Sequence, residues 1–206
     1  MEKVFIFDLD GTLLDSKTGI LLSLEIVLKK YSPEALPFLN ESIIGPPIKG
    51  MLDSLINDSS LVLDLAQHYR VHYDSVGFLE TKLYHGVRVG LTQLDNSLLF
   101  VSTNKPEKVA LKILKKLKIN NLFQKIICID SGTFSNKAEI VKSIVCGTSN
   151  TNITVIGDSQ DDYYSAKKNN CKFVFCDYGY GKLESNKKDY RIVNSASELF
   201  NYLSTV

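Results

Sequence analysis

Short apolar runs and amphipathic stretches alternate along most of this chain. The runs have the length of strands that are buried on both faces in a parallel sheet, where the alternation of a half-exposed strand is lost. Predicted strands cover residues 4–7, 98–101, 125–129, 152–156 and 172–175, with a short sixth at 190–193. Helical periodicity is found in the segments 87–94, 106–117, 137–145, 161–169 and 197–203. Strands that alternate with helices in this way predict an α/β fold with a doubly wound parallel sheet.

The alternation is interrupted after the first predicted strand. From Ile20 to Tyr31, apolar residues recur with the spacing of an amphipathic helix. That helix ends where Pro33 disfavours the helical backbone of the residue before it. Two further helices with loops between them are expected in the same segment, and no strand. We therefore predict that residues 16–85 form a helical module inserted into a core of residues 1–15 and 86–206.

Composition and charge narrow the class of protein. The chain has 206 residues, of which 44% are hydrophobic and 23% are charged, as in a folded globular domain. Lys and Arg number 24 and Asp and Glu number 23, so the net charge of +1 favours neither a nucleic acid nor an anionic membrane as a partner. No apolar stretch approaches the roughly 20 residues that cross a bilayer.

The four cysteines indicate a reducing compartment. None of them forms a Cys-x-x-Cys pair, and Cys128, Cys171 and Cys176 lie in or beside apolar runs, where buried thiols are expected. The chain also starts almost directly with a predicted strand, without the pattern of a secretory leader. The sequence therefore predicts a cytoplasmic protein, and both a monomer and a homodimer are compatible with it.

The first predicted strand ends in two acids, Asp8 and Asp10, and Gly11 then allows a sharp turn. Carboxylates at positions i and i+2 point to the same side of an extended chain. Two like charges held close together raise at least one pKa, and a divalent cation or a proton can offset them. Either outcome suits catalysis, as a carboxylate nucleophile beside a metal or as a protonated acid beside a carboxylate. A solvated strand end is the plain alternative.

Polar residues also follow later strands, at the edge of the sheet where α/β proteins bind ligands. Ser102, Thr103 and Asn104 form a strand-to-helix turn whose hydroxyl and N–H groups favour an anion, although such residues favour turns in general. Asp158 follows the fourth predicted strand, and Asp162 shares its face if a helix begins there. Oxygen ligands at strand ends suit Mg²⁺.

Lys137 is predicted to begin the helix after the third strand. The helix dipole favours an acid at that place, so a lysine there is a slight indication of a functional role, although a surface lysine is the default for any one of the 24 basic residues. Lys125 and Lys142 are nearby alternatives, but their positions at a strand start and in mid-helix fit less well.

Four segments resemble the motifs of one family, the haloacid dehalogenase (HAD) superfamily of phosphatases and phosphotransferases. Residues 4–16, with their Asp-x-Asp-Gly-Thr centre, resemble its first motif. Ser-Thr-Asn-Lys-Pro at 102–106 is similar to the second motif of phosphoglycolate-phosphatase-like members. Lys137 is similar to the third motif, and residues 157–166 to the fourth. The motifs occur in the order of the family, and each falls at the end of a predicted strand or the start of a predicted helix.

The resemblance extends over the whole chain. The inserted module at 16–85 is similar to the small helical cap of the first cap type, and residues 178–181 resemble the tail of phosphoglycolate-phosphatase-like proteins. Ala138 stands where the family often has Pro, and Asn-Asn at 169–170 stands where many members have Ala-Gly. The implied architecture is a Rossmann-like HAD core with a small α-helical cap domain.

The resemblance implies a catalytic mechanism and assigns residues to it. Asp8 would attack phosphorus and form an aspartyl-phosphate, and Asp10 would give a proton to the leaving oxygen. The phosphoryl group would be held by Thr103, by the backbone N–H of Asn104 and by Lys137.

The resemblance also implies a metal site and a source of specificity. Mg²⁺ would be held by the Asp8 carboxylate, the Asp10 carbonyl and Asp158. Asp162 would be a substitute ligand or would contact the ligands from behind. Lys49 lies in the segment that resembles the loop of the cap facing the active site. It is a candidate for binding a substrate carboxylate or a second phosphate, and a solvated lysine is an equally good interpretation.

The function expected from the resemblance is the hydrolysis of a small phosphorylated metabolite, with phosphoglycolate as the family-level substrate. A phosphotransferase such as a β-phosphoglucomutase-like sugar-phosphate mutase, or a pyrophosphatase, is an alternative. A non-catalytic binding module on the same fold is a third possibility. The joint presence of Asp8, Asp10, Thr103, Lys137 and Asp158 argues against that last one.

Overall fold

The computed structural model describes residues 3–148, 152–183 and 189–206. The chain forms two compact units, one from the residues up to Asp15 together with Leu83–Val206, and the other from Ser16–Lys82. We call them the main unit and the inserted unit. The predicted end of the inserted part, residue 85, lies three residues beyond Lys82, where the inserted unit ends.

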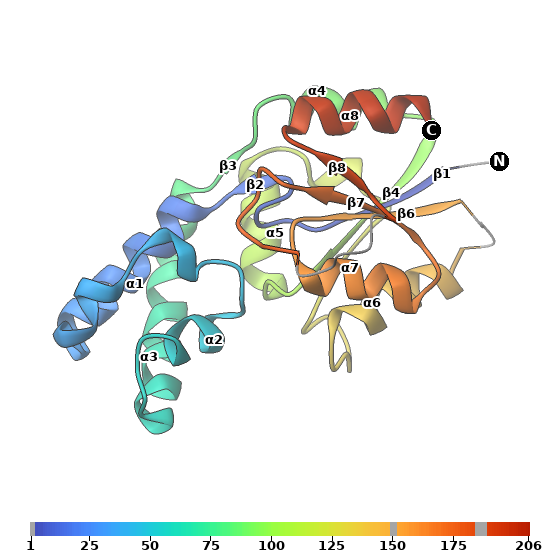
Figure 1. Ribbon diagram of the computed structural model, residues 1–206. Helices are drawn as coiled ribbons and strands as arrows, with labels where there is room; N and C mark the ends of the chain where they lie inside the picture. Colours follow the sequence, from blue (N-terminus) through green and yellow to red (C-terminus); the bar gives the residue numbers. More distant parts are fainter. Residues whose placement is uncertain (1–2, 149–151, 184–188) are drawn as a thin grey trace. The chain divides into compact units, whose positions relative to one another are not determined.

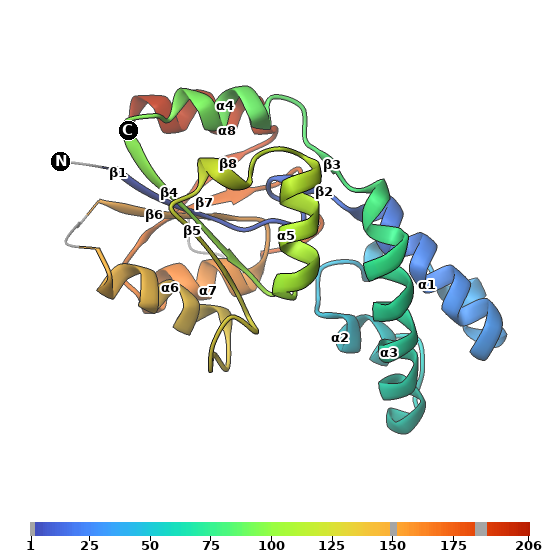
Figure 2. The same ribbon diagram turned by 180° about the vertical axis from the view of Figure 1, so that it is seen from behind.

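Six parallel strands form the sheet of the main unit, in the order β5-β4-β1-β6-β7-β8 (Figures 1 and 2). They are β1 (Lys3–Phe7), β4 (Ser97–Thr103), β5 (Lys125–Cys128), β6 (Ile153–Gly157), β7 (Lys172–Cys176) and β8 (Arg191–Val193). β1 lies between β4 and β6, and Phe7 pairs with Val101 on one side and Ile156 on the other. The prediction of a doubly wound parallel sheet is confirmed.

Helices cover both faces of this sheet. They are α4 (Val87–Gln93), α5 (Glu107–Lys116), α6 (Lys137–Cys146), α7 (Gln160–Lys168) and α8 (Ala196–Thr205), with a 3₁₀ turn, η4, at Asn120–Leu122. Figures 1 and 2 show α4 and α8 over one face and α6 and α7 over the other. The predicted helices are therefore present, with ends shifted by a few residues, as is usual for helix boundaries.

The central strand is buried on both faces. Val4 and Ile6 pack in a cluster with Ile140 of α6 and other apolar residues of that face. Phe7 points to the opposite face, where its ring stacks on Phe200 of α8 at a centroid distance of 6.1 Å. An apolar run without alternation is the pattern that this double burial requires.

The inserted unit is helical. It contains α1 (Lys17–Tyr31), α2 (Ile48–Asp53) and α3 (Ser59–Ser75), with 3₁₀ turns η1 (Pro33–Phe38), η2 (Glu41–Ile43) and η3 (Gly77–Glu80). β2 (Leu14–Asp15) and β3 (Lys82–Leu83) make up a separate two-stranded sheet. The expectation of no strand between residues 16 and 85 was therefore wrong at Lys82–Leu83, because a two-residue strand is too short to produce a pattern.

The cysteines are free thiols. Cys128, Cys171 and Cys176 are buried as predicted, and Cys146 is exposed. Burial raises the pKa of Cys171 to about 11, so this thiol is protonated at neutral pH. Among the helices that the structure describes, none combines the length and the apolar character needed to cross a membrane.

Candidate functional site

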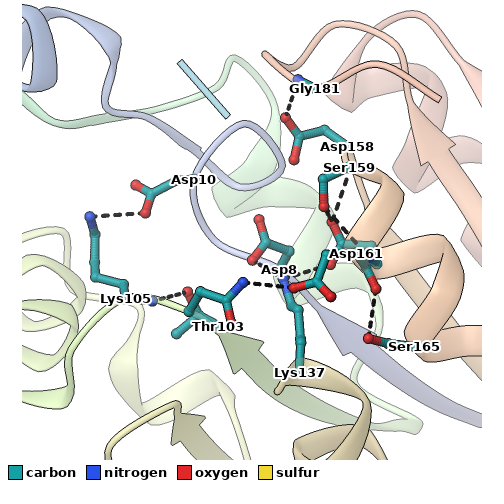
Figure 3. A network of polar contacts seen from close by, with 12 residues as sticks. Asp8, Asp10, Thr103, Lys105, Lys137, Asp158, Ser159, Asp161, Ser165 and Gly181 are labelled. Atoms are coloured by element: carbon teal, nitrogen blue, oxygen red, sulfur yellow. Dashed lines mark hydrogen bonds and ion pairs between the residues drawn. The ribbon is translucent and has the colours of Figure 1, made fainter. Parts of the chain in front are cut away.

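The carboxyl ends of three adjacent parallel strands bring predicted site residues together. Asp8 follows β1, Thr103 ends β4 and Asp158 follows β6, and all three residues are buried. Figure 3 shows them grouped with Lys137, which begins α6. Open α/β sheets bind ligands at the carboxyl edge where the strand order reverses, and β1 stands at that point of this sheet.

Lys137 joins two carboxylates. Its Nζ lies 2.5 Å from Asp8 Oδ1 and 2.6 Å from Asp162 Oδ1, and the lysine is 3% exposed. Asn136 caps α6 by accepting a backbone N–H of its first turn, which fixes the helix start that carries Lys137. Asp162 Oδ2 accepts the Ser159 N–H at 3.1 Å and the Ser159 hydroxyl at 2.5 Å, in a capping box of α7.

Burial and the neighbouring charges, both opposite and like, set the electrostatics of this cluster. Burial raises the pKa of Asp8 well above its ordinary value, and Lys137 opposes that rise. The nearby carboxylates of Asp162 and Asp158 raise it further. Burial disfavours the charge on Lys137, but Asp162 and Asp8 outweigh burial and raise the pKa of the lysine. Lys137 is therefore a cation at neutral pH, shared by two acids.

Asp158 is held by the loop that follows β7. Its Oδ2 accepts the backbone N–H groups of Tyr180 at 2.7 Å and Gly181 at 3.0 Å. Burial and the neighbouring Asp162 raise the pKa of Asp158 to about 6, although the two N–H groups favour the charged form. The Asp158 carboxyl therefore ionises near pH 6, and around this pH a bound cation would compete with the proton for its oxygens.

Two glycines leave room for the Asp158 carboxylate. A Cβ on Gly11 would lie 2.1 Å from Asp158 Oδ2, and a Cβ on Gly179 would lie 2.5 Å from the same atom. Gly11 also has a φ of +82°, which residues with side chains rarely adopt. The Tyr178 hydroxyl donates to the Thr12 carbonyl at 2.8 Å and so joins the two loops. The turn after β1 and the loop after β7 thus enclose this carboxylate together.

The arrangement of acids fits a divalent cation. Asp8, Asp158 and Asp162 each offer a carboxylate oxygen, and these atoms lie within 4.8 Å of one another. Three carboxylates face one ammonium, that of Lys137, so the group is negative when all are ionised. Hard oxygen donors of this kind suit Mg²⁺. The expected use of the Asp10 carbonyl as a ligand stays a prediction.

Asp10 contacts a different cation. Its Oδ2 lies 2.9 Å from Lys105 Nζ, and the Lys105 side chain is 7% exposed. Lys105 lies in the turn after β4, and its backbone N–H donates to Thr103 Oγ1 at 3.1 Å. Asp10 Oδ1 is buried and has no hydrogen-bond partner within the described part of the chain. Figure 3 shows Asp10 turned to Lys105 and Asp8 turned to Lys137.

Two other predicted residues make contacts of their own. Asn104 is exposed, and its side-chain Nδ2 donates to Asp161 Oδ2 at 2.8 Å. Lys49, in the inserted unit, lies 3.8 Å from Asp53 Oδ2, and its side chain is 60% exposed. An exposed pair at this spacing contributes about 0.3–0.5 kcal/mol to stability. The phosphate contact expected of the Asn104 backbone and the substrate contact expected of Lys49 stay predictions.

Two parts of the site were not predicted from the sequence. Lys105 received no role, because a lysine in a polar turn has the pattern of a surface residue. The loop at 178–181 was compared with a family tail, but its contact with Asp158 was not foreseen. A signal was present in the second case. Gly179 and Gly181 lie three and five residues after the end of β7 at Cys176, and glycines often mark a place where the backbone approaches another group closely.

Comparison with known proteins identifies the family. A model of haloacid dehalogenase-like hydrolases matches residues 5–176. The chain belongs to this family. It is an HAD hydrolase, and the resemblance drawn from the four motifs is confirmed. The match spans all the strand ends that carry the site described above.

Several relatives of this HAD hydrolase are phosphatases. A phosphoglycolate phosphatase from Aquifex aeolicus is 29% identical over 198 residues, which are 92% of this chain and 92% of that protein. A 5'-nucleotidase from Pseudomonas aeruginosa is 27% identical over 183 residues, 85% of this chain and 83% of that protein. A solved structure described as a predicted phosphatase from Clostridium acetobutylicum is 30% identical, covers 100% of both chains and has a TM-score of 0.85.

Gly179→Ala tests the enclosure of Asp158. The added methyl would lie 2.3 Å from Asp158 Cβ and 2.5 Å from the Gly11 carbonyl oxygen, so a strand end or a turn must shift. We expect the free energy of unfolding in urea to fall by about 1–3 kcal/mol, as in overpacked cores.

Gly147→Ala is the matched control for this prediction. A Cβ there would meet its nearest atoms at 3.3 Å and 3.5 Å, and we expect a change of less than about 0.5 kcal/mol. Equal losses in the two variants would contradict the enclosure argument.

Proposed function

We propose that this HAD hydrolase is a Mg²⁺-dependent phosphatase that hydrolyses a small phosphomonoester through an aspartyl-phosphate. The observation that carries the proposal is the Asp8 carboxylate, which Lys137 holds at the end of the central strand beside two further buried acids. Phosphoryl transfer needs a positioned nucleophile, neutralisation of phosphoryl charge and a proton for the leaving oxygen. The residues around Asp8 are suited to supply each of these.

In the first step, an Asp8 carboxylate oxygen attacks phosphorus, and the bond from phosphorus to the leaving oxygen breaks. Asp10 gives its proton to that oxygen, so an alcohol leaves and an aspartyl-phosphate remains. Thr103 Oγ1 accepts the Lys105 N–H, and its own hydroxyl proton is left to donate to a phosphoryl oxygen. The Asn104 backbone N–H is the second donor that we propose.

In the second step, a water molecule attacks phosphorus and gives a proton to the Asp10 carboxylate. The bond from phosphorus to the Asp8 oxygen breaks, which releases inorganic phosphate and returns both aspartates to their starting states. The Lys137 ammonium stabilises the negative charge that returns to Asp8, whereas burial alone would disfavour that charge.

Mg²⁺ would be held by Asp8 and Asp158, and we propose the Asp10 carbonyl as a third ligand. When bound, the ion neutralises charge on the phosphoryl oxygens. Asp162 belongs to the same group of carboxylates, but both of its oxygens already have partners. We infer that the main role of Asp162 is to hold Lys137 in place.

The proposed substrate class rests on the relatives and on the inserted unit. Phosphoglycolate phosphatases from Aquifex aeolicus and Colwellia psychrerythraea are each 29% identical over 198 residues, so a phosphoglycolate-like metabolite is our first candidate. The likeness to a 5'-nucleotidase makes a nucleoside monophosphate the second. We propose that the inserted unit acts as a cap that selects the substrate, with Lys49 as a candidate for binding a second anionic group.

A substrate panel tests the proposed specificity. Phosphate release is measured with Mg²⁺ for phosphoglycolate, a nucleoside 5'-monophosphate, a sugar phosphate and pyrophosphate. We expect the highest kcat/KM with phosphoglycolate. A preference for pyrophosphate would identify a pyrophosphatase, and phosphoryl transfer between sugar positions would identify a mutase. No turnover of any of them would indicate a binding module.

Asp8→Asn tests the nucleophile. An amide cannot form the acyl phosphate, so we expect phosphate release from every substrate to fall by at least about 10³-fold, as when a nucleophile is removed from other enzymes. Asp95→Asn is the control, because Asp95 is an exposed acid of the turn before β4 and should leave the rate unchanged. A fully active Asp8→Asn variant would contradict the proposed mechanism through an aspartyl-phosphate on Asp8.

The stabilisation by Mg²⁺ should depend on pH. With the pKa of Asp158 at about 6, this carboxyl is mostly protonated at about pH 5 and ionised at about pH 7.5, and a cation competes with that proton. We expect the rise in melting temperature caused by Mg²⁺ to be small at the lower pH and several-fold larger at the higher pH.

The metal-free protein should show the opposite trend at this residue. A pKa raised from 3.8 to about 6 means that the folded state favours protonated Asp158. Its contribution to stability is therefore present below about pH 4 and is lost as the pH rises through about 6.

Asp158→Asn is the control for the Mg²⁺ experiment and should show little stabilisation by Mg²⁺ at either pH. A stabilisation that survives in this variant would place the cation elsewhere.

A further inference from the structure

Lys105 contacts both the acid and the phosphate-binding hydroxyl of the proposed mechanism. Its Nζ lies 2.9 Å from Asp10 Oδ2, and its backbone N–H donates to Thr103 Oγ1. Its side chain is 7% exposed, although lysine is rarely found buried without a specific partner. A residue placed for solubility alone would extend into water instead.

The backbone on both sides of this contact is fixed. The N–H groups of Thr12, Leu13 and Leu14 all donate to the Leu9 carbonyl, so the turn that carries Asp10 has little freedom. Lys105 lies between the last residue of β4 and the proline before α5. The side-chain torsions of Asp10 are then the main remaining freedom of the acid.

The ion pair removes that freedom. Lys105 is the side-chain partner that the structure gives the Asp10 carboxylate through Oδ2, and Asp10 Oδ1 has no hydrogen-bond partner within the described residues. Removal of the ammonium would leave the carboxylate without its anchor. Proton transfer is sensitive to such changes, because acid and acceptor must lie within hydrogen-bond reach in the transition state.

We propose that Lys105 is a positioning residue for proton transfer by Asp10, an inference that rests on the proposed phosphatase function. Its ammonium holds the Asp10 carboxylate in one orientation, and its backbone N–H donates to the Thr103 hydroxyl that we propose binds the phosphoryl group. As the bond from phosphorus to the leaving oxygen breaks, the proton of Asp10 moves to that oxygen, and Lys105 is unchanged by the step.

The leaving group of the substrate separates this role from others. An alcohol of high pKa needs the proton in the transition state, whereas p-nitrophenolate leaves without much help. For Lys105→Met, with Mg²⁺, we expect kcat/KM to fall by about 10–100-fold with phenyl phosphate and by less than about 3-fold with p-nitrophenyl phosphate. Lys108→Met removes one charge from an exposed position on α5 and should leave both values unchanged.

A double-mutant cycle tests whether Lys105 acts through Asp10. It adds Asp10→Asn and the double variant Asp10→Asn/Lys105→Met to the set. If Lys105 acts through Asp10, the double variant is no slower with phenyl phosphate than Asp10→Asn alone. The double variant also removes both charges of the pair, so its comparison with Asp10→Asn stays informative even if an unpaired Asp10 impairs the folding of Lys105→Met. Circular dichroism and thermal unfolding report whether each variant is folded.

Three results would overturn the inference. Equal losses with both aryl phosphates would indicate a general structural role. A loss confined to substrates with a second anionic group, such as phosphoglycolate, would indicate substrate binding by Lys105. Additive effects in the cycle would separate Lys105 from Asp10. Asp8→Asn, assayed beside them, distinguishes this failure from failure of the phosphatase proposal, since an active Asp8→Asn variant overturns both.

Discussion

The structure depends on the confinement of three carboxylates, Asp8, Asp158 and Asp162, around the buried ammonium of Lys137. Burial of like charges is strongly unfavourable unless opposite charge or hydrogen-bond donors offset it. Two different groups compensate the charges here. The Lys137 ammonium forms ion pairs with Asp8 and Asp162, whereas backbone N–H groups of the loop after β7 donate to Asp158. The pKa of Asp8 and that of Asp158 are both raised, so the compensation within the protein is incomplete, and the divalent cation proposed above is suited to complete it.

The parallel sheet is what allows this confinement. β1 is buried on both faces and flanked by β4 and β6, so three strand ends meet at one edge without any loop having to reach far. The space for the Asp158 carboxylate is left by glycines in the turn after β1 and in the loop after β7. Gly11 and Gly179 admit the Asp158 carboxylate where a methyl group would collide with it. The acids are thus positioned by strands and by helix starts, which hold side chains more closely than long loops do.

Much of this could be predicted from the sequence, for physical reasons. The run at residues 4–7 has no polar position because both of its faces are covered, so the strand and the acid directly after it, Asp8, could be predicted together. The partner of each acid could not be predicted. Which lysine lies beside Asp10 depends on how the turn after β4 meets the turn after β1, and that contact joins residues 95 positions apart. The N–H groups that hold Asp158 were not predicted because almost every residue has a backbone donor, and the two glycines nearby indicate a close approach without naming its partner.

The two acids that open the site show why such contacts decide the chemistry. Positions i and i+2 share one side only in an extended chain, and the strand ends at Phe7. Beyond it, the chain folds back so that three N–H groups meet the Leu9 carbonyl. Asp8 therefore meets a lysine from α6, and Asp10 meets one from the turn after β4. In the proposed mechanism the nucleophile must stay charged while the acid must gain and lose a proton. Two neighbouring aspartates can divide these roles if different elements govern them, and here the two carboxylates contact lysines from different elements.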